Sequence, residues 1–376
     1  MQTKHTKSIS EYFFDDIKDY QIPLHLNEFN GKHSSNVINA LKKGIDSNAL
    51  SKYNSNLEMH RKLLNELSIY NNIDVKNIIL TNGADEALKL LIDSYSLSHN
   101  DVFMLSKTYR QYERFALLNN ANVRKIDFLD ELNELSNTHK TIIIICTPNN
   151  PTGKEITADE IRPFIDKYSN CLFIIDRTYS DYIKLINNFD DIMQNFNNKN
   201  NVFIVKSFSK AFGLAGIRLG YIISCKENIK ILNNIFNFKN IPNIVKIAGF
   251  YIMKNLEYYK KNAETTIDLK NDFVKFLRDR KQIVIDTRCN FILLHIFPNT
   301  NLIRFVDYLY SYYNEDETNS AISEKSINPN LEKIGSSNAK EILFGNKAKS
   351  VEIISTPPAA LKVITENNFG ALAFSQ

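Results

Sequence analysis

A lysine flanked by hydroxyl groups and followed by an arginine is the arrangement in this sequence that could do chemistry. Ser207 and Ser209 stand just before Lys210, and Arg218 lies eight positions beyond it. Phosphate is bound well by several hydrogen-bond donors together with the planar fork of a guanidinium, so these residues predict a phosphate site. A lysine amine beside such a site indicates a Schiff base to a cofactor that carries both a phosphate and a carbonyl group.

The neighbouring stretches predict that this lysine faces a cleft. The apolar run Val202 to Val205 is typical of a β-strand, and a loop rich in Gly and Ala follows Lys210. A side chain at the point where a strand gives way to a loop can face a cleft instead of bulk water. The alternative is a surface lysine in a loop that starts a helix, because short motifs also match by chance.

The stretch from Ser207 to Gly220 resembles a known motif. It has the form Ser-x-Ser-Lys-Ala-Phe-x-Leu-Ala-Gly-x-Arg-x-Gly. This is similar to the lysine motif of the fold-type I pyridoxal-phosphate (PLP) enzymes, and within them to the histidinol-phosphate aminotransferase branch of the class I/II aminotransferases. The resemblance implies that Lys210 forms the Schiff base with PLP, and that Ser207, Ser209 and Arg218 hold the cofactor phosphate.

A glycine-containing turn is a second candidate for the phosphate site. The run Val75 to Leu80 predicts a strand, after which Gly83, Ala84 and Asp85 open a helix whose first N–H groups point at whatever lies there. The turn resembles the Gly-Ala-Asp-Glu turn of the same enzymes, which implies that these three residues bind the PLP phosphate. A simple helix cap by Asn82 or Asp85 is the alternative.

Four further residues match family positions around the cofactor ring. The resemblance implies that Tyr109 lies flat on the pyridine ring, and that Asn150, in Pro-Asn-Asn-Pro-Thr-Gly, and Tyr179 donate to the phenolic oxygen. Asp176 follows an apolar strand predicted at Cys171 to Ile175 and matches the aspartate that pairs with the pyridine nitrogen. A carboxylate there favours the protonated nitrogen, so the ring can act as an electron sink.

A loop tyrosine matches a residue that the resembling enzymes share between subunits. Tyr53 corresponds to the tyrosine that reaches the phosphate of the neighbouring subunit's cofactor, although Asn54 and Asn56 replace the two prolines of that loop. The resemblance therefore implies a homodimer with composite sites. An exposed loop tyrosine is the alternative.

The predicted substrate end departs from the family. Most members place an arginine near the C-terminus that clamps the substrate carboxylate or phosphate, whereas here the position falls near Ile353 and the last arginine is Arg304. Isoleucine cannot replace a bidentate clamp. We therefore expect a substrate without the usual carboxylate contact, or another cation in place of the arginine. The candidate cations are Arg110, Arg177, Arg288 and Lys349.

Composition argues against several classes of protein. The 376 residues are 43% hydrophobic and 23% charged, with a dispersed net charge of +4, which favours a globular chain that binds neither nucleic acid nor membrane. The first ten residues contain no apolar signal, and the longest apolar run, Ile142 to Cys146, has the length of a buried strand. The seven scattered histidines predict no metal site. Four separate cysteines indicate reduced thiols of a cytoplasmic protein.

The predicted fold class is α/β of the fold-type I PLP transferases. The resemblance implies a mostly parallel seven-stranded sheet with helices on both faces, plus a smaller α+β domain. We predict an N-terminal arm at residues 1–30, a large PLP-binding domain at 31–245, and a linking helix with a small C-terminal domain at 246–376. The C-terminal part is expected to contain a single long helix, two strands and a second helix, at Ile244–Leu277, Gln282–Asp286, Phe291–Ile296 and Leu302–Tyr313.

The expected activity is that of a PLP-dependent aminotransferase acting on a small, phosphorylated amine or keto substrate. Lys210, once displaced by the substrate, would be the general base, with Asp176 and Tyr179 as the other catalytic residues. The alternative activity is decarboxylation of an O-phosphoamino acid of the phosphoserine or phosphothreonine type, which uses the same site. A third hypothesis, motivated by the missing arginine, is a PLP-binding protein without catalysis.

Overall fold

The computed structural model describes ten stretches of the chain, and all structural statements below concern them. They are residues 26–29, 31–46, 50, 57–96, 100–135, 141–279, 281–295, 350–354, 362–364 and 371–373. The chain divides into two compact units. The first contains the described residues within 32–150 and 154–263, and the second those within 26–31, 151–153 and 264–373. The domain boundaries near residues 30 and 245 stay predictions.

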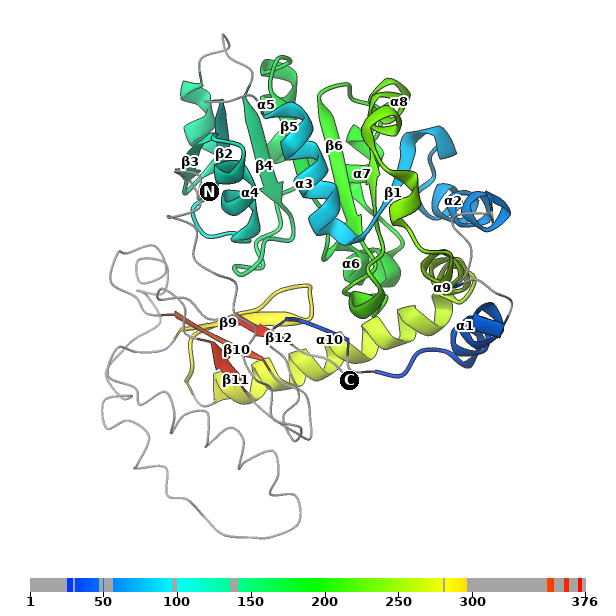
Figure 1. Cartoon of the computed structure of the whole chain (residues 1–376). Coiled ribbons are helices and arrows are strands. Elements are labelled where there is room, and N and C mark those ends of the chain that lie inside the picture. The colour runs from blue at the N-terminus through cyan, green and yellow to red at the C-terminus, as the bar shows by residue number, and fades with distance from the viewer. Residues whose placement is uncertain are drawn as a thin grey trace, which may run out of the picture. The chain divides into compact units, whose positions relative to one another are not determined.

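A seven-stranded sheet forms the centre of the first unit, with strand order β1-β7-β6-β5-β4-β2-β3 (Figure 1). Its strands are β1 Ile78–Thr81, β2 Asp101–Leu105, β3 Asn122–Ile126, β4 Ile142–Cys146, β5 Leu172–Asp176, β6 Val202–Ser207 and β7 Gly220–Ile223. Strands β2 to β6 pair in parallel, and β7 is antiparallel to both β6 and β1. The predicted mostly parallel seven-stranded sheet is confirmed.

Helices cover both faces of this sheet, as the α/β prediction requires (Figure 1). The described helices up to Met253 are α1 Ser35–Asp46, α2 Leu57–Asn71, α3 Gly83–Tyr95, α4 Gln111–Leu118, α5 Ala158–Lys167, α6 Ser180–Asn187, α7 Asp191–Phe196, α8 Lys226–Ile235 and α9 Asn243–Met253. Short 3₁₀ turns lie at Val75–Asn77, Leu129–Glu134, Ala215–Ile217 and Phe238–Asn240.

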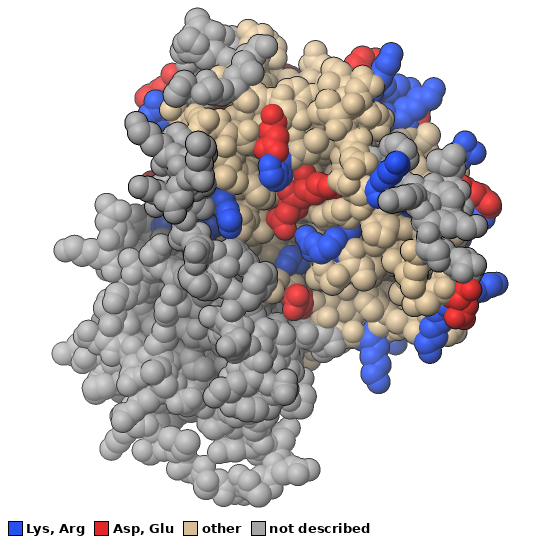
Figure 2. Space-filling view, viewed as in Figure 1, with Lys and Arg blue, Asp and Glu red and all other residues tan. Residues whose placement is uncertain are grey.

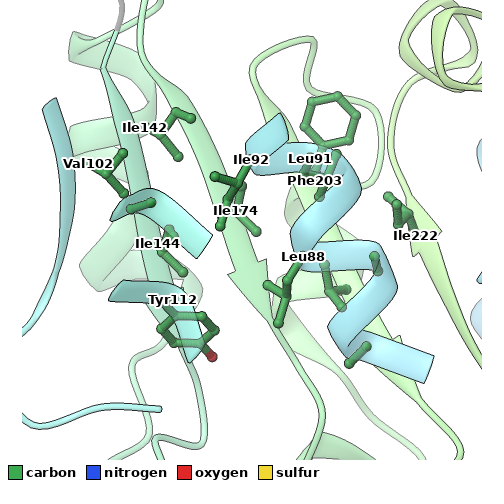
Figure 3. Packing of buried hydrophobic residues seen from close by; sticks show 14 of the residues in the cluster. Leu88, Leu91, Ile92, Val102, Tyr112, Ile142, Ile144, Ile174, Phe203 and Ile222 are labelled. Atoms are coloured by element: carbon green, nitrogen blue, oxygen red, sulfur yellow. The ribbon is translucent and has the colours of Figure 1, made fainter. Parts of the chain in front are cut away.

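The apolar run Ile142 to Cys146 is strand β4 and is buried along its whole length. A parallel strand between two helical layers has both faces covered, which is why its sequence is continuously apolar instead of alternating. Figure 3 shows Leu88, Leu91 and Ile92 of α3 packed over the strands, close to Ile174 of β5. This core fixes the sheet whose strand ends carry the polar residues described below.

The prediction of one helix from Ile244 to Leu277 is wrong. Helix α9 ends at Met253, and a separate helix, α10 Leu256–Asp279, begins three residues later. Asn255 explains the break: its amide nitrogen donates to the Tyr251 carbonyl at 2.6 Å, and its amide oxygen accepts from Asn36 at 2.8 Å. An asparagine side chain that takes a backbone carbonyl competes with the helical hydrogen bond.

The second unit contains a five-stranded sheet in which every pair is antiparallel. Its strands are β8 Val284–Ile285, β9 Phe291–His295, β10 Ser350–Ile354, β11 Lys362–Ile364 and β12 Ala371–Ala373. The two strands predicted around residues 284 and 293 are confirmed. The predicted helix Leu302–Tyr313 lies outside the described residues.

Charged side chains of both signs are interspersed on the face of the molecule that Figure 2 draws. This distribution agrees with the slight and dispersed net charge of +4. None of the helices in the described stretches is long and apolar enough to cross a membrane.

Candidate active site

Strand register brings the predicted site residues to one edge of the first unit's sheet. Cys146 of β4 lies beside Asp176 of β5, and Asp176 lies beside Val205 of β6. The three strands run parallel, so the segments that follow them leave the sheet at the same edge. Asn150 and Lys210 belong to these segments, at the position where open α/β sheets bind ligands.

Two glycines allow the start of β7 to lie close against the turn that follows β1. Gly220 of β7 pairs with Thr81 on one side and with Ser207 on the other. A Cβ at Gly220 would lie 2.6 Å from the carbonyl carbon of Gly83, and a Cβ at Gly83 would lie 2.6 Å from a terminal nitrogen of Arg218. Gly83 also has a φ of 76°. Glycine at both positions therefore lets the guanidinium lie directly against the turn that starts α3.

The Arg218 guanidinium gathers the polar groups of the predicted phosphate site. One terminal nitrogen donates to the Ser209 hydroxyl at 3.3 Å and to the Ala215 carbonyl at 2.9 Å. The other lies 3.3 Å from the Asp85 carboxylate, whose second oxygen accepts from the Tyr109 hydroxyl at 3.0 Å. The side chains of Arg218 and Asp85 are 42% and 47% exposed, so this cluster is open to a ligand.

A clasp of three side chains holds the turn before α3. The Asn82 side chain donates to the Asn240 carbonyl at 2.9 Å, and Asn240 donates to Glu86 at 2.9 Å. Glu86 in turn accepts from the Asn82 N–H at 2.6 Å. Because the Asn82 side chain makes no hydrogen bond to the first helical turn, the simple cap by Asn82 does not describe this helix start.

Lys210 follows a turn that Ser207 shapes. The buried Ser207 hydroxyl accepts from the N–H of Ser209 at 3.1 Å, which curls the chain at the end of β6. The Lys210 ammonium nitrogen lies 5.7 Å from the centre of the Tyr179 ring. Asn150 donates to the Tyr179 hydroxyl at 3.4 Å. The structure therefore brings an amine, a phenol and a primary amide together at the ends of three neighbouring strands.

The two asparagines after β4 have different environments. Asn149 is fully buried, accepts from the Thr108 hydroxyl at 2.7 Å and donates to the Lys107 carbonyl at 2.8 Å. It ties the loop after β4 to the loop after β2. Asn150 is the partly exposed member and faces Tyr179, so it is the one available to a ligand.

Asp176 is the most deeply buried of the predicted ring contacts. It is 3% exposed, and its oxygens accept from the Thr178 N–H at 2.9 Å and from the Tyr112 hydroxyl at 2.6 Å. Burial raises the pKa of this carboxyl, and the nearby Asp85 charge adds to the rise. Among the ion pairs of the described residues, none includes Asp176.

Sequence reasoning missed Tyr112. This tyrosine is fully buried in the first turn of α4 and donates to Asp176, while its ring meets that of Tyr109 edge-on at 5.5 Å. The available signal was its spacing, since a residue three positions after Tyr109 lies one helical turn away on the same side. A tyrosine at that spacing is also typical of a core residue.

A buried ionic cluster, also missed from the sequence, lies behind the lysine strand. Lys206 of β6 is fully buried, and its ammonium donates to the Ser180 hydroxyl at 2.7 Å and to Asp181 at 2.8 Å. Asp190 lies 3.5 Å from the same ammonium and 2.8 Å from the Arg177 guanidinium. The cluster thereby joins β6, which leads to Lys210, to the first turn of α6, which directly follows Tyr179.

Comparison with known families agrees with this geometry. The sequence pattern of the family described as "Aminotransferase class I and II" matches residues 19–325. The chain belongs to this aminotransferase family. It is 29% identical over 306 residues to "Histidinol-phosphate aminotransferase 2" of Oceanobacillus iheyensis, covering 77% of this chain and 81% of that protein. It is 30% identical over 284 residues to "Histidinol-phosphate aminotransferase" of Sulfurimonas denitrificans, covering 73% and 77%.

A third relative of this aminotransferase is "Dihydroxyacetone phosphate transaminase" of Campylobacter jejuni, 29% identical over 303 residues, covering 77% of this chain and 79% of that protein. Among solved structures, histidinol-phosphate aminotransferase of Sinorhizobium meliloti in complex with pyridoxal-5'-phosphate has a TM-score of 0.66 at 20% identity, covering 76% of this chain and 79% of the other. The solved structure confirms the predicted fold-type I architecture, and membership of the aminotransferase class I and II family confirms the predicted PLP dependence.

The site residues of this aminotransferase fit PLP in charge. Asp176 is a buried carboxylate without an ion-pair partner in the described part of the chain, which suits a protonated ring nitrogen. At the other end, Arg218, Ser209 and the start of α3 offer a guanidinium, a hydroxyl and backbone N–H groups to a phosphate.

Not all of the cations suggested in place of the missing C-terminal arginine could contact a substrate. The Arg177 guanidinium is buried and bound to Asp190 at 2.8 Å and to the Thr147 carbonyl at 2.9 Å, so the suggestion that it binds substrate is wrong. Arg110 and Arg288 are exposed. Lys349 and Tyr53 lie outside the described residues.

Asp176→Asn should change protein stability and PLP affinity in opposite directions. The folded-state pKa is raised from its ordinary 3.8, so the folded protein keeps the proton longer than the unfolded chain. The free energy of unfolding without PLP therefore falls as pH rises above about 4. We expect the PLP-free variant to have a higher urea midpoint than the PLP-free original protein at pH 7, with the difference vanishing near pH 4.

The same variant should bind PLP at least about tenfold more weakly, because a hydrogen bond to a charged partner is lost. Equilibrium dialysis measures this affinity. Asp159→Asn, at a side chain that is 94% exposed, serves as the control and should change neither quantity appreciably. Unchanged PLP affinity in Asp176→Asn would contradict the assignment of Asp176 to the ring nitrogen.

Lys206→Met should destabilise the fold by about 3–5 kcal/mol, because it removes the buried cation that pairs with the buried Asp181 carboxylate. The measurement is urea unfolding followed by far-ultraviolet circular dichroism. The control is Lys199→Met, which breaks the exposed pair with Asp166 and should cost less than about 1 kcal/mol. Equal losses in the two variants would show that the buried cluster contributes no more than a surface pair.

Proposed function

We propose that this aminotransferase moves an amino group between a donor and a small phosphorylated amine or ketone, with Lys210 as the catalytic base. The observation that carries the proposal is the meeting of Lys210, Tyr179 and Asn150 at the sheet edge that also holds Asp176. Together they supply an amine, hydrogen-bond donors and a buried carboxylate, which are the groups that this chemistry requires.

When bound, PLP supplies an electron sink for the electron pair released at the substrate carbon. Asp176 is assigned to the pyridine nitrogen, where its buried carboxylate holds a proton on that atom. Tyr112 and the Thr178 N–H fix the carboxylate by hydrogen bonds of 2.6 and 2.9 Å, so its orientation does not depend on the ligand.

Arg218, Ser209, Ser207 and the residues Gly83–Asp85 are assigned to the cofactor phosphate. Arg218 already lies against the α3 turn and contacts Ser209, so these donors converge without rearrangement of the backbone. Preformed donors of this kind lower the cost of binding. Tyr109 is assigned to the ring face, held through its hydroxyl bond to Asp85.

Lys210 is assigned the movement of the proton. Its amine nitrogen would take the proton from the substrate carbon and deliver it to the cofactor carbon that had formed the Schiff base. The lysine follows a strand that the buried Lys206 cluster secures, so its position depends on rigid elements. Tyr179 and Asn150 would hold the cofactor by hydrogen bonds to its phenolic oxygen.

The relatives support a phosphorylated substrate. The names of three of them specify histidinol phosphate or dihydroxyacetone phosphate as what they act on. Decarboxylation of a phosphoamino acid is the weaker candidate. A threonine-phosphate decarboxylase of Porphyromonas gingivalis shares the fold, with a TM-score of 0.61 over 76% of this chain and 87% of the other, but at 19% identity.

The assembly and the cellular location are further parts of the proposal. A homodimer in which Tyr53 reaches the neighbouring phosphate site follows from the resemblance. The cytoplasm is supported by the cysteines, since Cys146, Cys171, Cys225 and Cys289 are all buried thiols.

A panel of amino donors tests the proposed reaction. The PLP-loaded protein is mixed with glutamate, histidinol phosphate, phosphoserine, phosphothreonine or serinol phosphate. We expect conversion of PLP to pyridoxamine phosphate with at least one phosphorylated amine, measured by absorbance and chromatography. Carbon dioxide release without that conversion would support the decarboxylase, and the absence of both reactions with every compound would contradict the proposal.

A further inference from the structure

A cavity lies at the free edge of the first unit's sheet. It has a volume of about 480 Å³ and is lined by the edge strand β1 together with residues of α2 and α8. Figure 1 shows β1 between these two helices. The volume is within the range of sites that bind small organic molecules. We call it the β1 cavity, and none of the residues assigned to PLP lines it.

The β1 cavity has an apolar floor. Ile79, Leu80 and Ile229 are buried, and Ile241 is also buried beside the half-buried Phe236. These side chains come from β1, from α8 and from the segment that follows α8. A floor of this kind favours a ligand with an apolar ring or chain, because burying its surface there removes it from water.

The rim of the β1 cavity is positively charged. Lys76, Lys226 and Lys230 line it, and no lining residue is acidic. Asp74 lies 3.0 Å from the Lys226 ammonium and also accepts from the backbone N–H of Lys76. Among the ion pairs of the described residues, none includes the side chain of Lys76 or Lys230, so the rim has an excess of positive charge.

A further cation, Lys246, interacts electrostatically with a residue of the cavity lining. His60 lines the β1 cavity, and its pKa is lowered by burial and, to a smaller extent, by the positive charges of Lys246 and Arg61. Lys246 is fully buried, and its ammonium has no hydrogen-bond partner in the described part of the chain. An unpaired buried ammonium favours an anion nearby.

We propose that the β1 cavity binds a small organic anion, with the apolar body of the ligand on the floor and its acidic group at the lysine rim. The positive charge of the lysine rim favours an anionic ligand over a neutral one. A second copy of the chain covering the cavity is the competing occupant, and the experiment below distinguishes the two.

Anilinonaphthalene sulfonate (ANS) is a suitable probe, because it combines fused apolar rings with one anionic group. The PLP-loaded protein is titrated with ANS, and the fluorescence gives its Kd. The double variant Lys76→Glu/Lys230→Glu reverses two rim charges at exposed positions and should raise the Kd about tenfold or more. Asn233→Trp places an indole at the exposed part of the lining and should also weaken binding.

Lys125→Glu is the control, because Lys125 lies on β3 at the opposite edge of the same sheet and is exposed. It should leave the Kd of ANS unchanged. The proposal is overturned if ANS does not bind, or if the rim variants and the control bind it alike. Binding that appears only when the protein is diluted would also overturn it, because a second copy would then cover the cavity.

Discussion

The candidate site depends on one buried carboxylate, which has no ion-pair partner in the described part of the chain. Asp176 accepts two hydrogen bonds, from Tyr112 and from the Thr178 N–H, and its pKa is raised by burial. Such a group is unfavourable in the protein alone and becomes favourable when a protonated ring nitrogen lies against it. In the proposed function, this carboxylate at the end of β5 is the group that pairs with the cofactor nitrogen.

The surrounding elements hold the other groups at fixed places relative to this carboxylate. The parallel register of β4, β5 and β6 fixes the loops that carry Asn150 and Lys210 at one edge. Gly220 and Gly83 allow the start of β7 to lie close against the turn after β1, so that Arg218 contacts that turn. A site that binds a cofactor at two ends needs this rigidity, because small displacements cost affinity and rate.

Part of this arrangement could be predicted from the sequence. The run Ile142–Cys146 matches β4 because a strand buried on both faces must be apolar throughout. What failed depends on partners distant in the chain. From the sequence alone, Tyr112 cannot be told from an ordinary core tyrosine, because its bond to Asp176 appears only in the fold. In the same way, Lys206 is an unexplained charge in an apolar strand until the fold places Asp181 beside it. Likewise, the Asn255 side chain at the break between α9 and α10 accepts a hydrogen bond from Asn36, which lies far earlier in the chain.

The central claim is that Lys210 holds the cofactor at the meeting point of these strands. Borohydride reduction of the PLP-loaded protein fixes the cofactor on the lysine that carries it, and mass spectrometry of the peptides identifies that residue. The structure predicts a phosphopyridoxyl group on Lys210 and none on the buried Lys206, four residues earlier. Modification of another lysine, with Lys210 left free, would contradict the account.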